Sequence, residues 1–181
     1  MTPRKLSMDE LDRLSAEEFR NSPKHAFVFV LDDIRSLNNV GSIFRTADAF
    51  RAAKMYLCGL TGTPPQREIS KTALGAEESV AWEYREDMSA LLEALKTEGY
   101  RIVALEQAEG STKLHEFRPE PAVRYAFILG NEVFGVNDEA IDHCDICLEI
   151  PQFGTKHSLN VAVSAGIVAW DYLSKVMKNL T

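Results

Sequence analysis

The sequence lacks an apolar run long enough to cross a bilayer, and no apolar segment follows the basic residues Arg4 and Lys5. These absences argue against a membrane span and against a secretory signal peptide. Cysteine is scarce, and an odd count of three suits a reducing cytoplasm better than a disulfide framework. Basic residues number 20 against 27 acidic ones, for a net charge of −7. This balance excludes a molecule coated in basic patches but permits a local one.

Signatures of two common cofactor classes are missing as well. The sequence has no GxGxxG dinucleotide fingerprint. Cys144 and Cys147 are three residues apart in a predicted strand, so they would point to opposite faces and could not share a metal ion. We therefore expect no nicotinamide, no metal, and a buried structural role for both thiols.

The residues that are present predict one globular α/β domain. Hydrophobic residues make up 45% and charged residues 26% of the 181 residues, and no internal repeat is visible. Apolar strand-like segments alternate with segments of helical spacing, which predicts a mostly parallel sheet with helices on both faces. The predicted strands are 26–31, 54–59, 80–84, 100–106, 125–129 and 144–150, and 109–121 is predicted to be a polar connection.

The N-terminal segment carries a capping box, Ser7 to Glu10, that predicts an amphipathic helix with Leu11, Leu14 and Phe19 on its apolar side. We expect residues 1–24 to form a short helical extension. Residues 25–181 would then form the main domain.

The first polar cluster combines Asn39, Gly41 and Arg45 at the predicted start of a helix. Free N–H groups and the positive end of the helix dipole favour an anionic ligand there. The alternative is that Arg45 lies in solvent and pairs with Asp48, three residues further along the same helix.

The second cluster follows a predicted buried strand, and the third precedes the last predicted helix. Ligands of open α/β sheets bind beyond the carboxyl ends of strands. Ser158 is expected to cap the final helix. The alternatives are a polar turn with an exposed Glu132 and an ordinary strand–loop–helix connection. The second cluster contains Leu129, Gly130, Asn131, Glu132 and Gly135, and the third contains Ile150, Pro151, Ser158, Leu159 and Asn160.

Together the three clusters resemble the three motifs of the SpoU (TrmH-type) RNA ribose methyltransferases, from about Phe27 to the end of the chain. The resemblance implies the SPOUT α/β fold, in which the C-terminal part forms a trefoil knot. Nothing in composition or periodicity predicts a knot, and general rules of chain connection argue against one.

The resemblance also implies S-adenosylmethionine as cofactor and a ribose 2′-OH as methyl acceptor. Arginine is a poor general base, so Arg45 either accepts the proton with help from its surroundings or clamps the adjacent phosphate. The implied catalytic residues are Arg45, Asn39, Glu132, Ser158 and Asn160. The implied cofactor-binding residues are Leu129, Gly130, Asn131, Glu132, Gly135, Ile150, Pro151, Ser158, Leu159 and Asn160.

We expect the RNA partner to be tRNA, with ribosomal RNA as the alternative. A net charge of −7 does not favour a polyanion, so contact with RNA would depend on local basic residues. Those candidates are Arg35, Arg45, Arg51, Arg67 and Lys71. A hypothesis of a different class is a non-catalytic RNA-binding protein that retained the fold.

The final helix is apolar on nearly every side between Leu159 and Trp170, where the polar positions are Asn160 and Ser164. A helix that is apolar all round must be buried all round, and one sheet covers only one side. We therefore expect a homodimer through this helix. The alternative is that the N-terminal helix folds back over it.

Overall fold

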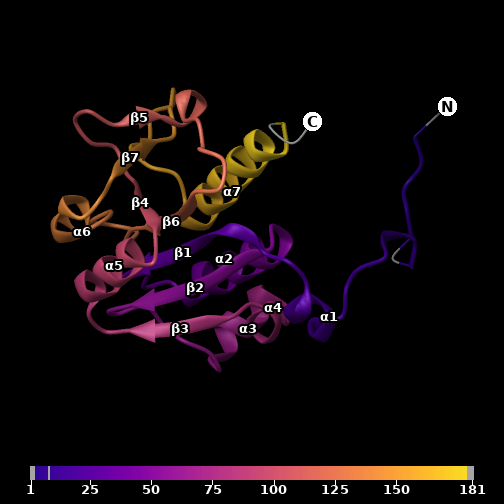
Figure 1. Ribbon diagram of the computed structural model, residues 1–181. Helices are drawn as coiled ribbons and strands as arrows, with labels where there is room; N and C mark the ends of the chain where they lie inside the picture. Colours follow the sequence, from indigo (N-terminus) through magenta and orange to yellow (C-terminus); the bar gives the residue numbers. More distant parts are fainter. Residues whose placement is uncertain (1–2, 8, 179–181) are drawn as a thin grey trace.

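The computed structural model describes residues 3–7 and 9–178, and a seven-stranded sheet runs through its centre (Figure 1). The strand order is β3-β2-β1-β6-β4-β7-β5, and every pair of neighbouring strands is parallel. This confirms the predicted parallel α/β sheet. The strands are β1 (His25–Asp32), β2 (Ala52–Cys58), β3 (Trp82–Arg85), β4 (Tyr100–Leu105), β5 (Thr112–Lys113), β6 (Arg124–Leu129) and β7 (Ile146–Glu149).

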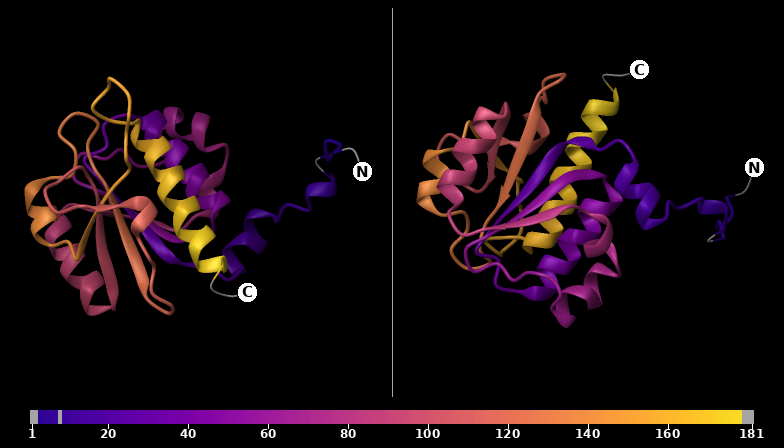
Figure 2. Two further views of the ribbon diagram at one scale, coloured as in Figure 1. Left: turned by 90° about the horizontal axis from the view of Figure 1, so that it is seen from above. Right: turned by 60° about the horizontal axis from the view of Figure 1, so that its bottom comes forward.

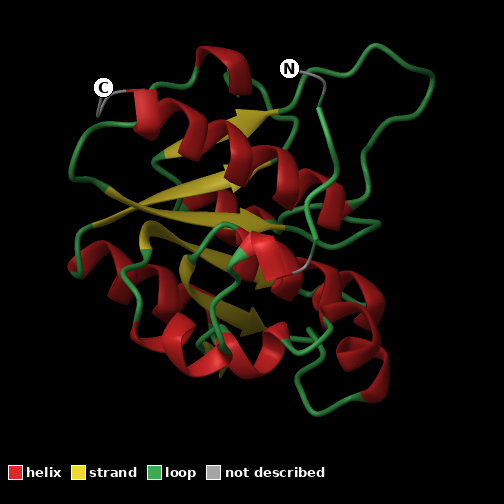
Figure 3. Cartoon of the chain, turned by 90° about the vertical axis from the view of Figure 1, so that its right-hand side faces the viewer, coloured by secondary structure: helices red, strands yellow, loops and turns green. Residues whose placement is uncertain are grey.

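Helices lie on both sides of the sheet, as the alternating pattern predicts (Figure 3). One apolar layer packs beneath α2, α3, α4 and α7, and a second packs beneath α5 and α6. The helices are α1 (Ala16–Asn21), α2 (Leu37–Ala49), α3 (Arg67–Ala73), α4 (Ala76–Ser79), α5 (Met88–Thr97), α6 (Asp138–Asp142) and α7 (Val161–Lys178), with short 3₁₀ turns η1 (Asp9–Leu11) and η2 (Leu114–Glu116).

Strand β1 is buried on both faces because its apolar side chains alternate between the two layers. Phe27 and Phe29 enter the α7 layer, while Val28 and Val30 enter the α5 layer. Tyr172 of α7 packs edge-on against Phe27, with the ring centroids 5.4 Å apart. This aromatic contact docks the last helix onto the first strand.

Strand β6 lies between β1 and β4, although it follows both in sequence. The chain builds outward from β1 through β2 to β3 and then continues on the other side of β1. The order of strands therefore reverses next to β1, and open α/β sheets bind ligands at the carboxyl ends of strands at such a point. The trefoil knot implied by the family resemblance stays a prediction.

Helix α7 lies beside α2 and keeps one apolar side in solvent (Figure 2). Val163, Trp170 and Met177 are 51%, 60% and 55% exposed and recur at intervals of seven residues. Helix α1 packs against α4, and Leu11 and Leu14 are themselves exposed. The N-terminal segment runs away from the body of the molecule (Figure 1), and Leu11 and Leu14 do not cover α7 as predicted, whereas Phe19 is buried in the α7 layer.

The single N-terminal helix expected from Ser7 is wrong. The Ser7 backbone N–H donates to the Glu10 carboxylate, but only a 3₁₀ turn follows, and Asp12 has a φ of 45°. A second capping box, Ser15 with Glu18, starts the real helix α1. Met8 lies outside the described residues, and the boundary between 1–24 and 25–181 stays a prediction.

Two expectations near the sheet edge also need correction. The segment 109–121 is not a plain connection, because β5 pairs with β7 there and the buried side chains of Leu114 and Phe117 follow it. Cys144 precedes β7 instead of lying in it, so the alternation rule does not apply. Both Cys144 and Cys147 pack against the α5 layer but are only partly buried, so the expectation that both are buried is wrong. In the described part of the chain, no helix is long and apolar enough to span a membrane.

Candidate functional site

A cavity of about 760 Å³ opens at the carboxyl edge of the sheet. Its walls come from the ends of β4, β6 and β7 and from the segment that precedes α7. These are neighbouring parallel strands, so their carboxyl ends meet at one edge. All of the predicted cofactor-binding residues line this cavity except Pro151: Leu129, Gly130, Asn131, Glu132, Gly135, Ile150, Ser158, Leu159 and Asn160.

A tight turn after β6 forms one wall of the cavity. The Asn131 side-chain oxygen accepts hydrogen bonds from the N–H groups of Val133 and Phe134, at 2.8 and 3.1 Å. Two backbone hydrogen bonds between Asn131 and Gly135 close the turn. A Cβ at Gly130 would lie 2.2 Å from the backbone of Gly135, so only glycine permits this close approach.

Glu106 and Gln107 also line the cavity, and the sequence analysis did not single them out. One Glu106 carboxylate oxygen accepts from the Val136 N–H at 3.0 Å, which ties β4 to the turn after β6. The Gln107 side-chain amide donates to the His157 carbonyl at 2.7 Å and so holds the loop before α7. The end-of-strand rule would have found both residues, because they directly follow β4.

The Glu132 carboxylate lies at the N-terminus of α2. It accepts hydrogen bonds from the N–H groups of Arg35 and Ser36, each at 3.0 Å, and from the Asn39 amide at 2.9 Å. Helix α2 begins at Leu37 with Ser36 as its cap, earlier than the predicted start at Asn39. The anion expected at this helix end is thus a carboxylate of the protein itself.

These contacts set the protonation of Glu132. Partial burial alone would raise the pKa of this carboxyl group. The hydrogen bonds from Asn39, Arg35 and Ser36 outweigh burial and hold the pKa below its ordinary value of 4.5. Glu132 is therefore ionised near neutral pH and acts as an acceptor, not as a proton donor.

Asn39 continues this polar connection to the last helix. Its side-chain oxygen accepts from the Asn160 amide at 3.1 Å. The Asn160 side-chain oxygen in turn accepts from the N–H groups of Ala162 and Val163, at 2.9 and 3.3 Å. Asn160 therefore caps α7, and the prediction that Ser158 does so is wrong because the helix starts two residues later than that cap requires. Ser158 is exposed at the cavity instead.

Arg45 lies apart from this group of residues. It lines a neighbouring cavity of about 470 Å³ between α2 and α3, together with Lys71. Asp48 accepts a hydrogen bond from the Ser79 hydroxyl at 2.8 Å. Within residues 3–7 and 9–178, no ion pair joins Arg45 to Asp48 or to another acid, so the expected alternative pairing is not formed.

The chemistry of the carboxyl-edge cavity suits an organic ligand with both apolar and polar parts. Leu105, Leu129, Leu148 and Ile150 supply apolar walls, while strand-end backbone groups and the Glu106 carboxylate supply polar ones. In the part of the chain that the structure describes, no cluster of three His, Cys, Asp or Glu side chains could hold a metal ion.

Two curated relatives show equal sequence identity. The chain is 34% identical over 165 residues to the 23S rRNA (guanosine-2′-O-)-methyltransferase RlmB of Neisseria meningitidis, covering 88% of this chain and 63% of the relative. It is 34% identical over 137 residues to the mouse tRNA (guanosine(18)-2′-O)-methyltransferase TARBP1, covering 74% of this chain and 8% of the relative. The chain thus spans less than two thirds of either relative.

A solved structure and a family profile extend the comparison. The AdoMet-bound rRNA methyltransferase from Sinorhizobium meliloti superimposes with a TM-score of 0.76 at 26% identity, covering 84% of this chain and 58% of that one. The profile of the SpoU rRNA Methylase family matches residues 26–170, which include all three polar clusters. The chain therefore belongs to the SpoU rRNA Methylase family.

Proposed function

We propose that this protein is an S-adenosylmethionine-dependent methyltransferase that modifies a ribose 2′-OH of RNA. The observation that carries the proposal is the carboxyl-edge cavity, whose walls are the family's motif segments. Its volume of about 760 Å³ lies within the roughly 300–1,000 Å³ typical of ligand sites. A related solved structure, 26% identical, is that of an AdoMet-bound rRNA methyltransferase.

The residues of this cavity have separate parts in the proposed reaction. Leu129, Gly130 and Ile150 would hold the adenosyl part between apolar walls and strand-end backbone groups. The bound cofactor supplies an electrophilic methyl group. The connected side chains of Glu132, Asn39 and Asn160 fix the helix ends around the place where a ribose hydroxyl would enter, which orients the acceptor.

Arg45 would act from the substrate side. A guanidinium keeps its proton at neutral pH, so proton acceptance by this side chain is unfavourable. Its place beside Lys71, without an acidic partner in the described chain, supports the phosphate-clamp alternative. In that role it would stabilise negative charge that develops on the attacking oxygen.

The homodimer remains part of this proposal. Val163, Trp170 and Met177 form an exposed apolar stripe on α7, and the N-terminal segment leaves it open. A two-fold contact between stripes of two copies would bury these side chains. The same contact would bring the α2–α3 cavity close to the partner, because its lining residue Phe50 packs against Trp170.

We propose tRNA as the substrate class, and the TARBP1 relative is named for a tRNA. Ribosomal RNA is the second candidate, because the RlmB relative is named for 23S rRNA and matches a larger share of this chain than TARBP1 does. We also place the protein in the cytoplasm, a reducing compartment that suits free thiols at Cys58, Cys144 and Cys147.

The decisive experiment has two arms. Calorimetry of the purified protein with S-adenosylmethionine should show one site per chain. Mass mapping of tRNA and ribosomal RNA from a deletion strain should show the loss of one 2′-O-methyl group, which the purified protein restores. Absence of cofactor binding by folded protein would overturn the proposal, whereas RNA binding without methylation would favour the non-catalytic alternative.

A further inference from the structure

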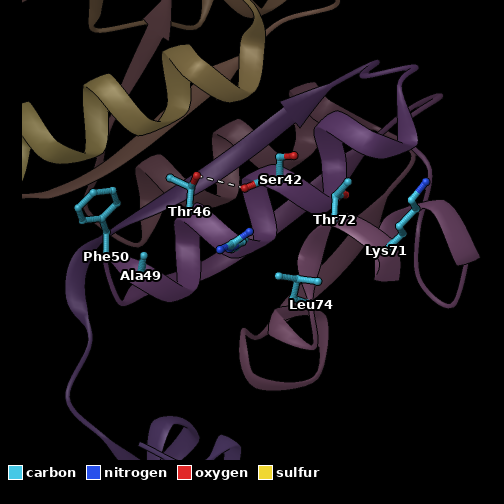
Figure 4. Close-up of a pocket in the computed structure, with 8 residues that line it drawn as sticks. Ser42, Thr46, Ala49, Phe50, Lys71, Thr72 and Leu74 are labelled. Atoms are coloured by element: carbon cyan, nitrogen blue, oxygen red, sulfur yellow. Dashed lines mark hydrogen bonds between the residues drawn. The ribbon is translucent and has the colours of Figure 1, made fainter. Parts of the chain in front are cut away.

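The α2–α3 cavity is distinct from the carboxyl-edge cavity and is lined by a different set of groups. Ser42, Arg45 and Thr46 come from α2, while Lys71, Thr72 and the following Leu74 come from α3 and its cap (Figure 4). The Ser42, Thr46 and Thr72 hydroxyls all donate to backbone carbonyls. These hydroxyls are already used within the protein, so the groups that remain to bind a ligand are the cationic side chains of Arg45 and Lys71.

These two cations are unusual for a chain with a net charge of −7. No carboxylate lines the cavity, and the structure pairs neither Arg45 nor Lys71 with an acid anywhere in residues 3–7 and 9–178. Two like charges at one cavity concentrate positive potential there, in a protein whose net charge is −7. The arrangement favours an anion, and the paired cations suit a phosphate.

The close packing of α2 and α3 holds together the two backbones that carry Arg45 and Lys71. A Cβ at Gly41 would lie 2.1 Å from the Thr72 hydroxyl oxygen and 2.3 Å from the Ile69 carbonyl oxygen. The Thr72 hydroxyl also donates to the Asn38 carbonyl at 3.0 Å. Lys71 therefore lies on a helix that packs tightly against the helix carrying Arg45. This packing pre-positions the backbone and Cβ of Lys71.

The rim of the cavity contains a residue with an unusual backbone conformation. Leu74 caps α3 in the left-handed conformation, with a φ of 55°, and is 67% exposed. A branched apolar residue rarely adopts this conformation, and such strain is often found at functional sites. Leu74, Ala49 and Phe50 give the cavity an apolar edge beside its charges, which suits a nucleotide better than a bare ion.

We propose that the α2–α3 cavity binds a backbone phosphate of the substrate RNA, with Lys71 as a positioning residue beside Arg45. This inference rests on the proposed function. Lys71 binds the RNA strand and does not touch the reacting atoms. Loss of the Lys71 side chain therefore weakens RNA binding more than it slows methyl transfer.

The test compares Lys71→Ala, Lys71→Arg and the wild type. Lys96→Ala is the matched control, because Lys96 is an exposed lysine on α5, across the sheet. The probes are tRNA and deproteinised 23S rRNA from the deletion strain, and binding is titrated from about 50 to about 200 mM KCl. For Lys71→Ala we expect the slope of log affinity against log salt to fall by about 0.7–0.9, the value for one phosphate contact.

Three further readouts separate this role from a purely structural one. Lys71→Ala should raise KM for RNA several-fold with little change in kcat, leave S-adenosylmethionine affinity unchanged, and be rescued by Lys71→Arg. If Arg45 and Lys71 hold the same phosphate, the double variant should lose less affinity than the two single losses combined.

A methylating enzyme whose Lys71→Ala variant keeps the wild-type salt slope and KM would overturn this inference alone. A variant that keeps the slope but loses dimer mass in light scattering would assign the cavity to a protein interface instead. A wild-type protein that binds neither RNA would overturn the inference together with the proposed function.

Discussion

At the scale of single residues, Glu132 shows how hydrogen bonds maintain a negative charge. Its carboxylate accepts hydrogen bonds from two backbone N–H groups and one side-chain amide. Its pKa is lower in the folded chain than the ordinary 4.5, so the folded state holds its proton less tightly than the unfolded state. The stability that it contributes is thus complete above pH 4.5 and is lost as the pH falls through the folded pKa.

We expect this loss to be visible when wild type is compared with Glu132→Gln. The gap in Tm between the two should be constant above pH 5 and shrink as the pH falls below about 4.5, because the wild-type carboxylate then becomes protonated. Thermal melts from pH 3 to 7 measure it. Glu86→Gln, at an exposed turn residue, is the control, and a gap that grows on acidification would contradict the assignment.

Arg45 should govern catalysis without governing cofactor binding. In Arg45→Ala, turnover should fall on the order of a hundredfold or more, because a main stabiliser of developing charge is removed. S-adenosylmethionine affinity should not change, since Arg45 lines a different cavity. Single-turnover methylation and calorimetry measure the two effects.

The matched variant is Arg45→Lys, which keeps the charge but loses the two-pronged geometry, and we expect an intermediate rate from it. Near wild-type turnover of Arg45→Ala on its true RNA would show that the catalytic role is wrongly assigned.

The predicted catalytic residues are brought together only in part, because Asn39, Glu132 and Asn160 form one hydrogen-bonded group and Arg45 lies apart from it. Asn39, Glu132 and Asn160 meet because their segments end at the same sheet edge, which strand order alone implies. That Glu132 would bind the N–H groups just before α2, leaving Arg45 outside the group, depends on side-chain geometry across 93 residues of separation between Glu132 and Asn39. Glu106 carries no motif of its own, and only its position directly after β4 marks it as a candidate.

At the scale of secondary-structure elements, the Asn160 side chain has two tasks at the start of α7. Its oxygen caps the helix and its amide donates to Asn39. Asn160→Ala removes both contacts, and we expect it to lower the free energy of unfolding by about 1 kcal/mol and to impair methylation.

Asn160→Ser separates the two tasks, because serine caps a helix about as well as asparagine but cannot reach Asn39 in the same way. We expect near wild-type stability and impaired methylation. Urea unfolding and steady-state kinetics provide the comparison, and full activity in Asn160→Ser would argue that the contact with Asn39 is dispensable.

A capping signal locates the start of a helix best where no second signal lies nearby. Asp87 and Asn137, residue types that favour the N-cap position, cap α5 and α6. The N-terminus offered two capping boxes only eight positions apart, Ser7 and Ser15, and only the second starts an α-helix. Strand β5 is two residues long and is defined by its pairing with β7, so no local pattern could reveal it.

At the scale of the whole molecule, we expect a dimer of about twice the 20.2 kDa chain mass. The double variant Val163→Glu and Trp170→Glu places charge on side chains that are 51% and 60% exposed, so it should leave the chain folded and make it monomeric. Light scattering at micromolar concentration measures the mass.

Leu14→Glu is the control for that variant, since Leu14 is 43% exposed in the N-terminal segment and should not affect the mass. A wild-type protein that is monomeric near 20.2 kDa with full methylation activity would contradict the dimer.

The position of β6 between β1 and β4 also determines when the sheet can form during synthesis on the ribosome. Both neighbours are synthesised before β6, so each emerges with an unpaired edge where its later partner belongs. The segment that ends at Asn160 is made later still, and the carboxyl-edge cavity lacks a wall until it arrives. A growing chain therefore passes through a stage with an open sheet centre, exposed to aggregation and unable to hold its cofactor, until the segment before α7 has been translated.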